Sequence, residues 1–453
     1  MTTQQEIPLY EEVVNGYNQL AAAGATRRES SDLRKTRQSA FEKFRESGFP
    51  TTKNEDWKYT NITRFLKEAY ALDGVASDSA GQPAGAAGIV DTALLEKARI
   101  AGLDCYTIVL VNGVWQKNIP GGELPAGVEL LTVADARQDP ALSAYFERPA
   151  DGKDRHFTAL NTALFSDGLF IRVNAGATPG KPLHIVHMFT AGYNLLVQPR
   201  HVWVINRHAE LSVIESVVAT GGDAKIWVNT LTELIVHTDA KLDHVVIQSA
   251  GEGIRLVQHT TVRQKRQSLY NNYTFTFPGA DLVRNELQAR LEEDHTETHL
   301  YGLYLAAGHQ LIDNHTLVDH QKPSCFSNEL YKGVLLEQST GVFNGKVFVH
   351  KDAQKTNAFQ QNNNLVISKK ATIDSKPELE IFADDVKCSH GSTVGQFSEE
   401  ALFYLRARGI GEDTAKGLLI NAFAFDVTEK IKLPAVETHI NELISAHIPL
   451  THA

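Results

Sequence analysis

The sequence has few cysteines. Only three occur in 453 residues, at Cys105, Cys325 and Cys388. An odd number at wide spacing argues against a disulfide framework and favours a reducing compartment. The N-terminal residues also lack the charged segment and short apolar run of a secretory signal. We therefore expect a cytoplasmic protein.

The sequence also lacks long apolar runs, an excess of basic charge and a nucleotide-binding loop. No stretch approaches the roughly 18 uninterrupted apolar residues of a membrane-spanning helix. Lys and Arg number 44 against 54 Asp and Glu, which gives a net charge of −10. Nonspecific nucleic-acid binding needs a basic surface. The phosphate-binding motif G-x-x-x-x-G-K-[ST] is also absent. Taken together, these absences lead us to expect that the chain binds neither membrane, nucleic acid nor ATP.

The composition changes along the chain and predicts four segments. Residues 1–70 carry a helical apolar period. Residues 71–98 are rich in Ala, Gly and Ser, which is typical of a flexible linker. Residues 99–396 contain short β-branched runs such as "GLFIRV" and "HVVIQS", bounded by turn residues, which predict a β core. Residues 397–453 return to a helical period.

The β segment favours a stacked coil. No helical pattern separates its strands, which excludes a doubly wound fold. The stretches "HAELSV" (208–213), "DAKLDHV" (239–245), "GADLVRN" (279–285) and "KATIDS" (370–375) share Ala, any residue, then Leu or Ile, at irregular spacing. Recurring tight turns suit stacked rungs, although a β-sandwich predicts similar strands. Asn362, Asn363 and Asn364 can hydrogen-bond between rungs, and a polar loop explains them almost as well.

The C-terminal segment predicts helices with apolar stripes. Ser398 is placed to cap a first helix, with acidic residues after it and basic residues before Gly409, in agreement with the helix dipole. A second helix has a stripe at Ala415, Leu418, Leu419, Ala422 and Phe423. A third follows Pro434, with a stripe at Val436, Ile440, Leu443 and Ile444. Such stripes must be buried on this chain or on a partner.

The stretch "DDVKCSHGSTVGQ" (384–396) is the main candidate site. On a strand, Cys388 and His390 point to the same face, where thiolate and imidazole can bind a soft or borderline metal. Two ligands leave such a site incomplete. The alternatives are a nucleophilic thiol whose base, His390, is oriented by Asp384 or Asp385, and a half-buried cysteine beside a solvated histidine.

The other two cysteines are weaker candidates. Cys325 lies near His315 and His320 in the sequence, which allows a second metal site, but 18 histidines make chance proximity common. Cys105 begins an apolar run and is expected in the core. Residues alone therefore yield an acidic, mainly β protein with helical ends and no complete active site.

The longer stretch "DDVKCSHGSTVGQFSEEALFYLRARGIG" (384–411) resembles the C-terminal signature of the SufB/SufD family, the scaffold subunits of the Suf iron–sulfur cluster assembly machinery. "NEDWKYTNITRF" (54–65) and "HFTALNTALFSDGLFIRV" (156–173) resemble other family segments, so the resemblance covers nearly the whole chain. SufB-type subunits usually carry a longer N-terminal region with cysteines and a Glu-rich segment in place of "VKCSHGS". The SufD type is therefore favoured, with the SufB type as the alternative.

The resemblance implies a right-handed parallel β-helix with N-terminal and C-terminal helical regions, and a non-enzymatic scaffold. Its implied partners are a SufB paralogue and the ATPase SufC, with sulfur supplied by a cysteine desulfurase or sulfur carrier. A homodimer is an alternative assembly. SufC would dock on the C-terminal helices, at Leu402, Leu405, Ala415, Leu418, Leu419, Ala422 and Phe423.

In the same resemblance, His390 faces a cysteine of SufB, and a transient Fe–S cluster forms at the junction of the two subunits. Cys388 is a second ligand or a relay for sulfur. The chain alone would hold no cofactor tightly. Reduced flavin is implied for the complex, without residues that can be named. The rival functions are a polysaccharide-active β-helix enzyme and a free-standing metal-binding protein.

Overall fold

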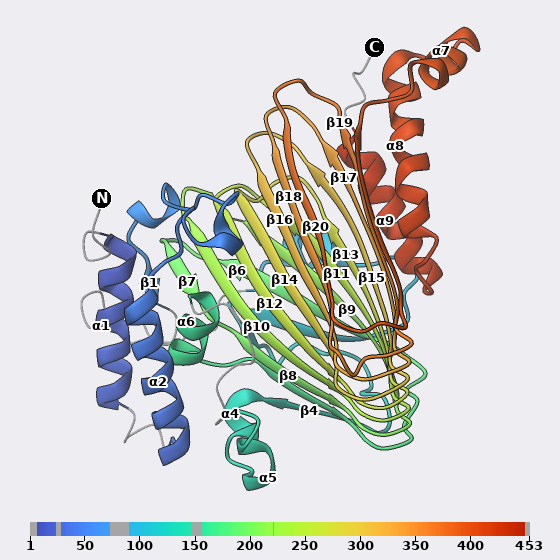
Figure 1. Ribbon diagram of the computed structural model, residues 1–453. Helices are drawn as coiled ribbons and strands as arrows, with labels where there is room; N and C mark the ends of the chain where they lie inside the picture. Colours follow the sequence, from blue (N-terminus) through green and yellow to red (C-terminus); the bar gives the residue numbers. More distant parts are fainter. Residues whose placement is uncertain (1–6, 24–28, 73–89, 147–155, 221, 449–453) are drawn as a thin grey trace.

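The computed structural model describes residues 7–23, 29–72, 90–146, 156–220 and 222–448. Its core is a solenoid of two stacked sheets (Figure 1). From β8 to β21, successive strands alternate between the two sheets, whereas the strands before β8 do not follow this strict alternation. Pairing within each sheet is parallel except for β2 with β3 and β4 with β5. The predicted mainly β fold, with a parallel β-helix core and helices at both ends, is confirmed.

The strands are distributed as follows. The 11-stranded sheet contains β1 (Ala71–Leu72), β4 (Val128–Thr132), β5 (Leu169–Val173), β7 (Leu195–Val197), β8 (Arg200–Ile205), β10 (Ile226–Val236), β12 (Ile254–Gln264), β14 (Leu282–Leu291), β16 (Leu311–His320), β18 (Thr340–Val349) and β20 (Thr372–Ile381). The 10-stranded sheet contains β2 (Tyr106–Val111), β3 (Val114–Trp115), β6 (Leu183–Thr190), β9 (Glu210–Thr220), β11 (Lys241–Ala250), β13 (Leu269–Thr276), β15 (Glu297–Ala306), β17 (Phe326–Leu335), β19 (Asn357–Val366) and β21 (Lys387–Gly395).

The turns that lead from the 11-stranded to the 10-stranded sheet are here called the forward turns, and six of them share one backbone device. The six consecutive forward turns from β8–β9 to β18–β19 each contain a non-glycine residue with φ between 57° and 60°; these residues are His208, Asp239, Gln267, His295, Ser324 and Lys355. This left-handed conformation costs roughly 1–2 kcal/mol for an L-residue. Its repetition in six successive coils indicates that these turns share one geometry, which the turn between β20 and β21 does not adopt.

The residue after each left-handed position fills the inner corner of the coil. These residues are Ala209, Ala240, Ser268, Thr296, Cys325 and Thr356, all buried. The recurring alanines of the sequence therefore belong to two kinds of turn. Ala209 and Ala240 lie in forward turns of neighbouring coils, whereas Ala280 and Ala371 lie in the return turns at the opposite edge, which explains their irregular spacing.

Helices from the N-terminal half cover the outer face of the 11-stranded sheet (Figure 1). They are α1 (Pro8–Ala23), α2 (Ser31–Ser47), two 3-10 helices (Glu55–Trp57 and Phe65–Lys67) and α6 (Phe157–Leu164). The Arg284 guanidinium on that face lies 3.8 Å from the centre of the Trp57 ring. The Thr60 hydroxyl donates to Asp313 at 2.5 Å. The segment "NEDWKYTNITRF" thus anchors the N-terminal region to the core.

The predicted linker is only partly described. Residues 73–89 lie outside the described residues, while the ends of the segment form β1 and α3 (Thr92–Ala98). Two further short helices, α4 (Val133–Ala136) and α5 (Pro140–Ser143), lie within the predicted β core. The division into segments at residues 70, 98 and 396 stays a prediction.

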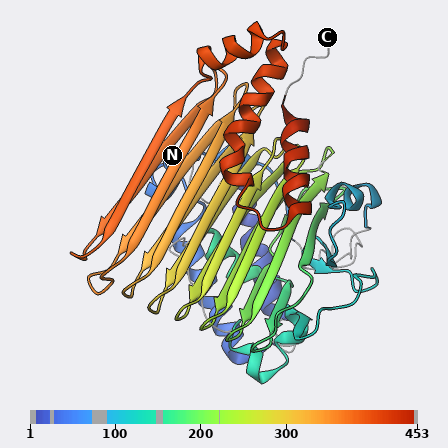
Figure 2. The ribbon, with the colours of Figure 1, turned by 90° about the vertical axis from the view of Figure 1, so that its right-hand side faces the viewer.

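The C-terminal helices are α7 (Glu399–Ala407), α8 (Glu412–Thr428) and α9 (Pro434–His447). Helices α8 and α9 lie on the outer face of the 10-stranded sheet (Figure 2), whereas α7 packs against α8 and projects away from the sheet (Figure 1). Ser398 caps α7 by accepting from the Ala401 backbone N–H at 3.2 Å, as predicted. The stripe of α9 is confirmed, with Val436, Ile440 and Ile444 fully buried. None of the helices in the described part of the chain combines the length and hydropathy needed to cross a membrane.

The predicted stripe of α8 is not buried as a single face on this chain. Ala415 is buried, but Leu418 is 47% exposed; Leu419 and Phe423 are half-buried and Ala422 is exposed. The helix buries another set, Gly417, Ile420, Ala424 and Val427. It carries apolar residues on two faces, and the geometry of the sheet selects which face is buried.

The two ends of the solenoid differ. At its start, the short antiparallel strands β3 and β4 close the sheets. At its other end, no described strand pairs with the outer edge of β20 or β21. Apolar side chains remain exposed there, including Phe382 at 59% and Val394 at 57%. Figure 2 shows these last strands, in orange, extending beyond the C-terminal helices that cover the earlier coils. We call this end the open end.

Candidate functional site

The structure places Cys388 and His390 on β21, the last strand of the 10-stranded sheet. They pair in register with Ala358 and Gln360 of β19, which are buried at 0% and 1% exposure. Side chains paired in this way point to the same side of a sheet. Cys388 and His390 therefore face the interior of the last coil, and His390 is exposed because no further coil covers it.

Cys388 is half-buried in a small apolar cluster that includes Val347, Val349 and Ala353. Burial raises the pKa of its thiol, and the backbone of Ala358 partly opposes this effect. The thiol therefore stays protonated near neutral pH, until a metal ion or a partner's charge displaces the proton. This environment does not suit an activated nucleophile, which needs a lowered thiol pKa.

The carboxylates that could orient His390 lie elsewhere. Asp384 and Asp385 are exposed in the turn before β21. The Asp385 backbone N–H donates to the Gln354 side-chain oxygen at 2.9 Å, which fixes this turn to the preceding coil. The structure therefore brings Cys388 and His390 together and leaves the two aspartates outside the coil.

A ladder of buried polar side chains runs through the interior towards the open end. Asn362 accepts from Asn364 and from Ser375, both at 2.7 Å. The hydroxyls of Ser375 and Ser392 lie 2.8 Å apart, joining the two sheets at the last coil. The suggestion that the three asparagines bond between rungs is confirmed. Asn362 donates to the Tyr331 carbonyl at 3.2 Å, Asn363 accepts from the Thr393 hydroxyl at 2.8 Å and Asn364 accepts from the Tyr304 hydroxyl at 2.6 Å.

A column of inward-facing polar side chains lies beneath His390, formed by Gln360 on β19 and Glu329 on β17. The Glu329 carboxyl is buried and accepts from the Thr316 hydroxyl at 2.5 Å and from Gln360 Nε2 at 2.8 Å. Burial raises its pKa to about 7. The other polar atom of the Gln360 amide, Oε1, is buried without a partner in the described part of the chain. No local pattern in the sequence predicts this column.

The second cysteine cluster suggested by the sequence is not formed. Cys325 accepts from the Thr296 hydroxyl at 3.0 Å within its turn corner. His320 contacts Ser327 inside the coil at 2.9 Å, whereas His315 pairs with Asp313 on the outer face at 2.9 Å. Within the described ranges, no three His, Cys, Asp or Glu side chains converge closely enough to hold a metal ion. Cys105 is half-buried rather than a core residue.

The C-terminal helices present an exposed apolar surface. Helix α7 has no buried residue, and its Phe403 and Tyr404 are 74% and 58% exposed. Leu418 and Phe425 on the outer face of α8 are 47% and 53% exposed. The predicted docking residues Leu402 and Leu405 are half-buried beside this surface. Sequence reasoning missed the aromatic side chains because it followed only one helical stripe.

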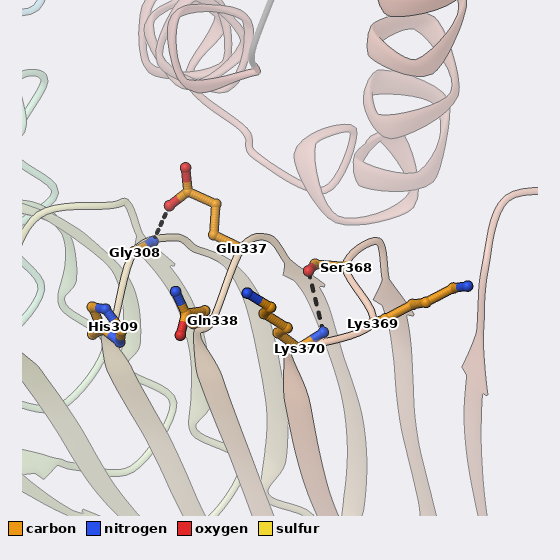
Figure 3. A pocket seen from close by; sticks show the side chains of 7 residues that line it. All are labelled: Gly308, His309, Glu337, Gln338, Ser368, Lys369 and Lys370. Atoms are coloured by element: carbon orange, nitrogen blue, oxygen red, sulfur yellow. Dashed lines mark hydrogen bonds between the residues drawn. The ribbon is translucent and has the colours of Figure 1, made fainter.

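A shallow polar hollow of about 580 Å³ lies at the return turns, away from the start of β21. Three successive turns line it, through Gly308, His309, Glu337, Gln338, Ser368, Lys369 and Lys370. Figure 3 shows Glu337 bonded to the Gly308 backbone and Lys369 pointing outward. Its lining includes one imidazole, that of His309, but no cysteine, so it does not combine sulfur and imidazole as the open end does.

Comparison with known proteins covers both halves of the chain. Residues 11–185 match the SufBD protein N-terminal region. Residues 188–423 match the SufBD core domain of the SUF system for Fe–S cluster assembly. The boundary between the two matches falls within the β core, at β6, and the core match extends into α8.

Individual relatives agree. An iron–sulfur cluster assembly SufBD family protein of Synechocystis is 30% identical over 92% of this chain and 91% of its own length. The iron–sulfur cluster assembly protein SufD of Escherichia coli is 28% identical over 89% of this chain and 90% of its own. The iron–sulfur cluster assembly protein SufD of Bacillus subtilis is 24% identical over 71% of this chain and 73% of its own length. The chain therefore belongs to the SufBD family of iron–sulfur cluster assembly proteins.

Proposed function

We propose that this chain is a non-enzymatic scaffold subunit for iron–sulfur cluster assembly, and that its open end pairs with a SufB-type subunit. The observation that carries the proposal is the position of His390 and Cys388. They face the interior of a coil that has no successor, so a second subunit stacked on β20 and β21 would meet them directly. Exposed strand edges are ready templates for such pairing.

The incomplete ligand set fits a shared site. Thiolate and imidazole are both iron–sulfur ligands, and imidazole raises the potential of a cluster. Cys388 and His390 supply two ligands, and the partner would supply the rest. The cluster is cargo in this proposal, so neither subunit alone should hold it firmly. The family membership argues against the rival polysaccharide-active enzyme.

We further propose that the ATPase SufC docks on α7 and the outer face of α8. Exposed apolar patches on soluble proteins mark interaction sites. This surface combines Phe403, Tyr404, Leu418 and Phe425 with the predicted residues beside them. Hydrolysis of ATP by SufC would supply motion that this chain, which has no nucleotide-binding loop, transmits to the open end.

The test is cluster assembly in the complex. This chain, a SufB-type subunit and SufC are co-expressed, and iron and acid-labile sulfide are measured in the purified complex. His390→Ala should lower both severalfold, and Cys388→Ala should show whether the thiol is also a ligand. His309→Ala is the matched control, because His309 is also exposed but lies in the return-turn hollow. An unchanged yield in His390→Ala would remove His390 from the site.

Several finer expectations stay predictions. They are the reduced flavin of the complex, the sulfur supply from a desulfurase or carrier, the cytoplasmic location and the choice between a homodimer and the complex with SufB. Size-exclusion chromatography of the chain with and without its partners addresses the last of these, since a scaffold should co-elute with SufC.

A further inference from the structure

Gln360 occupies an unusual position beneath the candidate site. It is 1% exposed and lies one ladder step below His390, on the same inward face. Adjacent strands are about 4.8 Å apart, within the reach of a glutamine side chain. Of its two amide atoms, Nε2 donates to Glu329 at 2.8 Å, while Oε1 is buried without a partner in the described residues.

Two neighbours fix the Gln360 amide. The pKa of Glu329 is about 7, so its carboxyl is ionised at pH 8. In that form it can only accept hydrogen bonds, and it selects the orientation in which the Nε2–H groups face it. On the opposite sheet, a Cβ added at Gly345 would lie 2.6 Å from Gln360 Nε2. The side chain therefore fills the space beside this glycine and has little room to turn. Its Oε1 is left as an acceptor held in one place.

A histidine that binds a metal almost always donates its other ring N–H to a carboxylate, carbonyl or water, which fixes its tautomer and orientation. We propose that Gln360 is the positioning residue for His390, and that its Oε1 accepts a hydrogen bond from one ring N–H of His390. The other ring nitrogen then keeps its lone pair directed to the open end. The exposed His390 side chain needs only to turn towards the sheet to form this bond. The inference rests on the proposed role of His390.

The direct test is the tautomer of His390 in the full chain. Long-range proton–nitrogen NMR spectra of histidine-labelled protein at pH 8 distinguish a ring with one defined tautomer from a mixture, and His390→Ala assigns the signals. One tautomer should dominate in the wild type. Gln360→Met, which keeps the length of the side chain, should lower the tautomer ratio about fivefold, the value for a hydrogen bond of about 1 kcal/mol.

The controls use the same strand. Gln361→Met changes the neighbouring glutamine, which is exposed on the opposite face, and should leave the tautomer unchanged. Gln360→Glu places a second carboxyl beside Glu329, and the pair keeps one shared proton that replaces the Nε2–H bond. The free oxygen is again an acceptor, so the single tautomer should be kept. A wild-type tautomer ratio in Gln360→Met, or a mixture in Gln360→Glu, would overturn the inference.

Cluster assembly separates this inference from the proposed function. In the complex, Gln360→Met should lower cluster yield by about tenfold, as removal of such a supporting bond does at metal sites, and Gln360→Glu should restore it. If His390→Ala abolishes assembly but Gln360→Met keeps the tautomer, only the inference fails. If Gln360→Met changes the tautomer but His390→Ala assembles clusters normally, the hydrogen bond stands and the proposed function fails.

Discussion

The buried carboxyl of Glu329 makes the stability of the solenoid depend on pH. Burial raises its pKa from the ordinary 4.5 to about 7, against the opposing hydrogen bonds of Thr316 and Gln360. Below about pH 4.5 the group is neutral in both the folded and the unfolded chain. Between pH 4.5 and pH 7, Glu329 ionises in the unfolded chain but keeps its proton in the folded chain. The free energy of unfolding therefore falls as pH rises, and the contribution of Glu329 is lost once the pH passes about 7.

The magnitude follows from the size of the shift. A displacement of about 2.5 pH units at about 1.36 kcal/mol per unit corresponds to a loss of about 3 kcal/mol. Glu329→Gln removes the titration but keeps the size and polarity of the side chain. The free energy of unfolding of the variant, relative to the wild type, should therefore increase by about 3 kcal/mol between pH 4.5 and pH 8.

Urea denaturation of both proteins across this pH range measures the difference. With a denaturant slope of about 3 kcal/mol per molar, the difference between the urea midpoints of the variant and the wild type should be about 1 M larger at pH 8 than at pH 4.5. Groups that titrate identically in both proteins cancel in the comparison. Glu252→Gln, an exposed carboxylate, is the control and should show no such separation. A difference that stays constant with pH would show that Glu329 ionises as easily as in solvent and refute the reasoning.

Three further predictions concern packing. Gly302→Ala should destabilise by about 1–3 kcal/mol in urea denaturation, because the new methyl overlaps the Tyr331 ring; an unchanged midpoint would show that the ring can move. Ile420→Ala should lower the free energy of unfolding by about 2–5 kcal/mol, because it removes a buried side chain. Phe425→Ala should change that free energy by no more than about 0.5 kcal/mol, but it should weaken SufC binding measured by calorimetry. Unchanged binding would show that the ATPase docks elsewhere. Cys325→Ala should lower stability by about 1 kcal/mol and leave the iron content of the complex unchanged, and a loss of iron would contradict its structural role.

Local patterns in the sequence were sufficient for the elements and the class of fold. Short β-branched runs predicted the strands, and Ser398 and Pro434 correctly marked helix starts. The coil period was harder to recognise. Between β8 and β21, paired residues of neighbouring coils lie from 27 to 32 positions apart, and the recurring alanines fall in two turn families with different spacing. The buried face of α8 could not be chosen either, because both of its faces are apolar.

The candidate site was only half visible in the sequence. The spacing of Cys388 and His390 placed them on one face of a strand, since residues two positions apart on a strand always share a face. The column formed by Glu329, Gln360 and His390 depends on the register of three coils. That register is set by the lengths of the intervening turns, which no local pattern reports.

The open end explains why the site requires this fold. The two earlier residues of the column, Glu329 and Gln360, are each buried by the coil that follows, and both are 1% exposed. One additional coil would bury His390 in the same way and close the proposed site to iron. Leaving the end open exposes apolar side chains and unpaired strand edges, which proteins normally protect. A partner that stacks on β20 and β21 would cover both and enclose His390 together with its own ligands. We therefore expect stable pairing and cluster assembly to depend on the same surface.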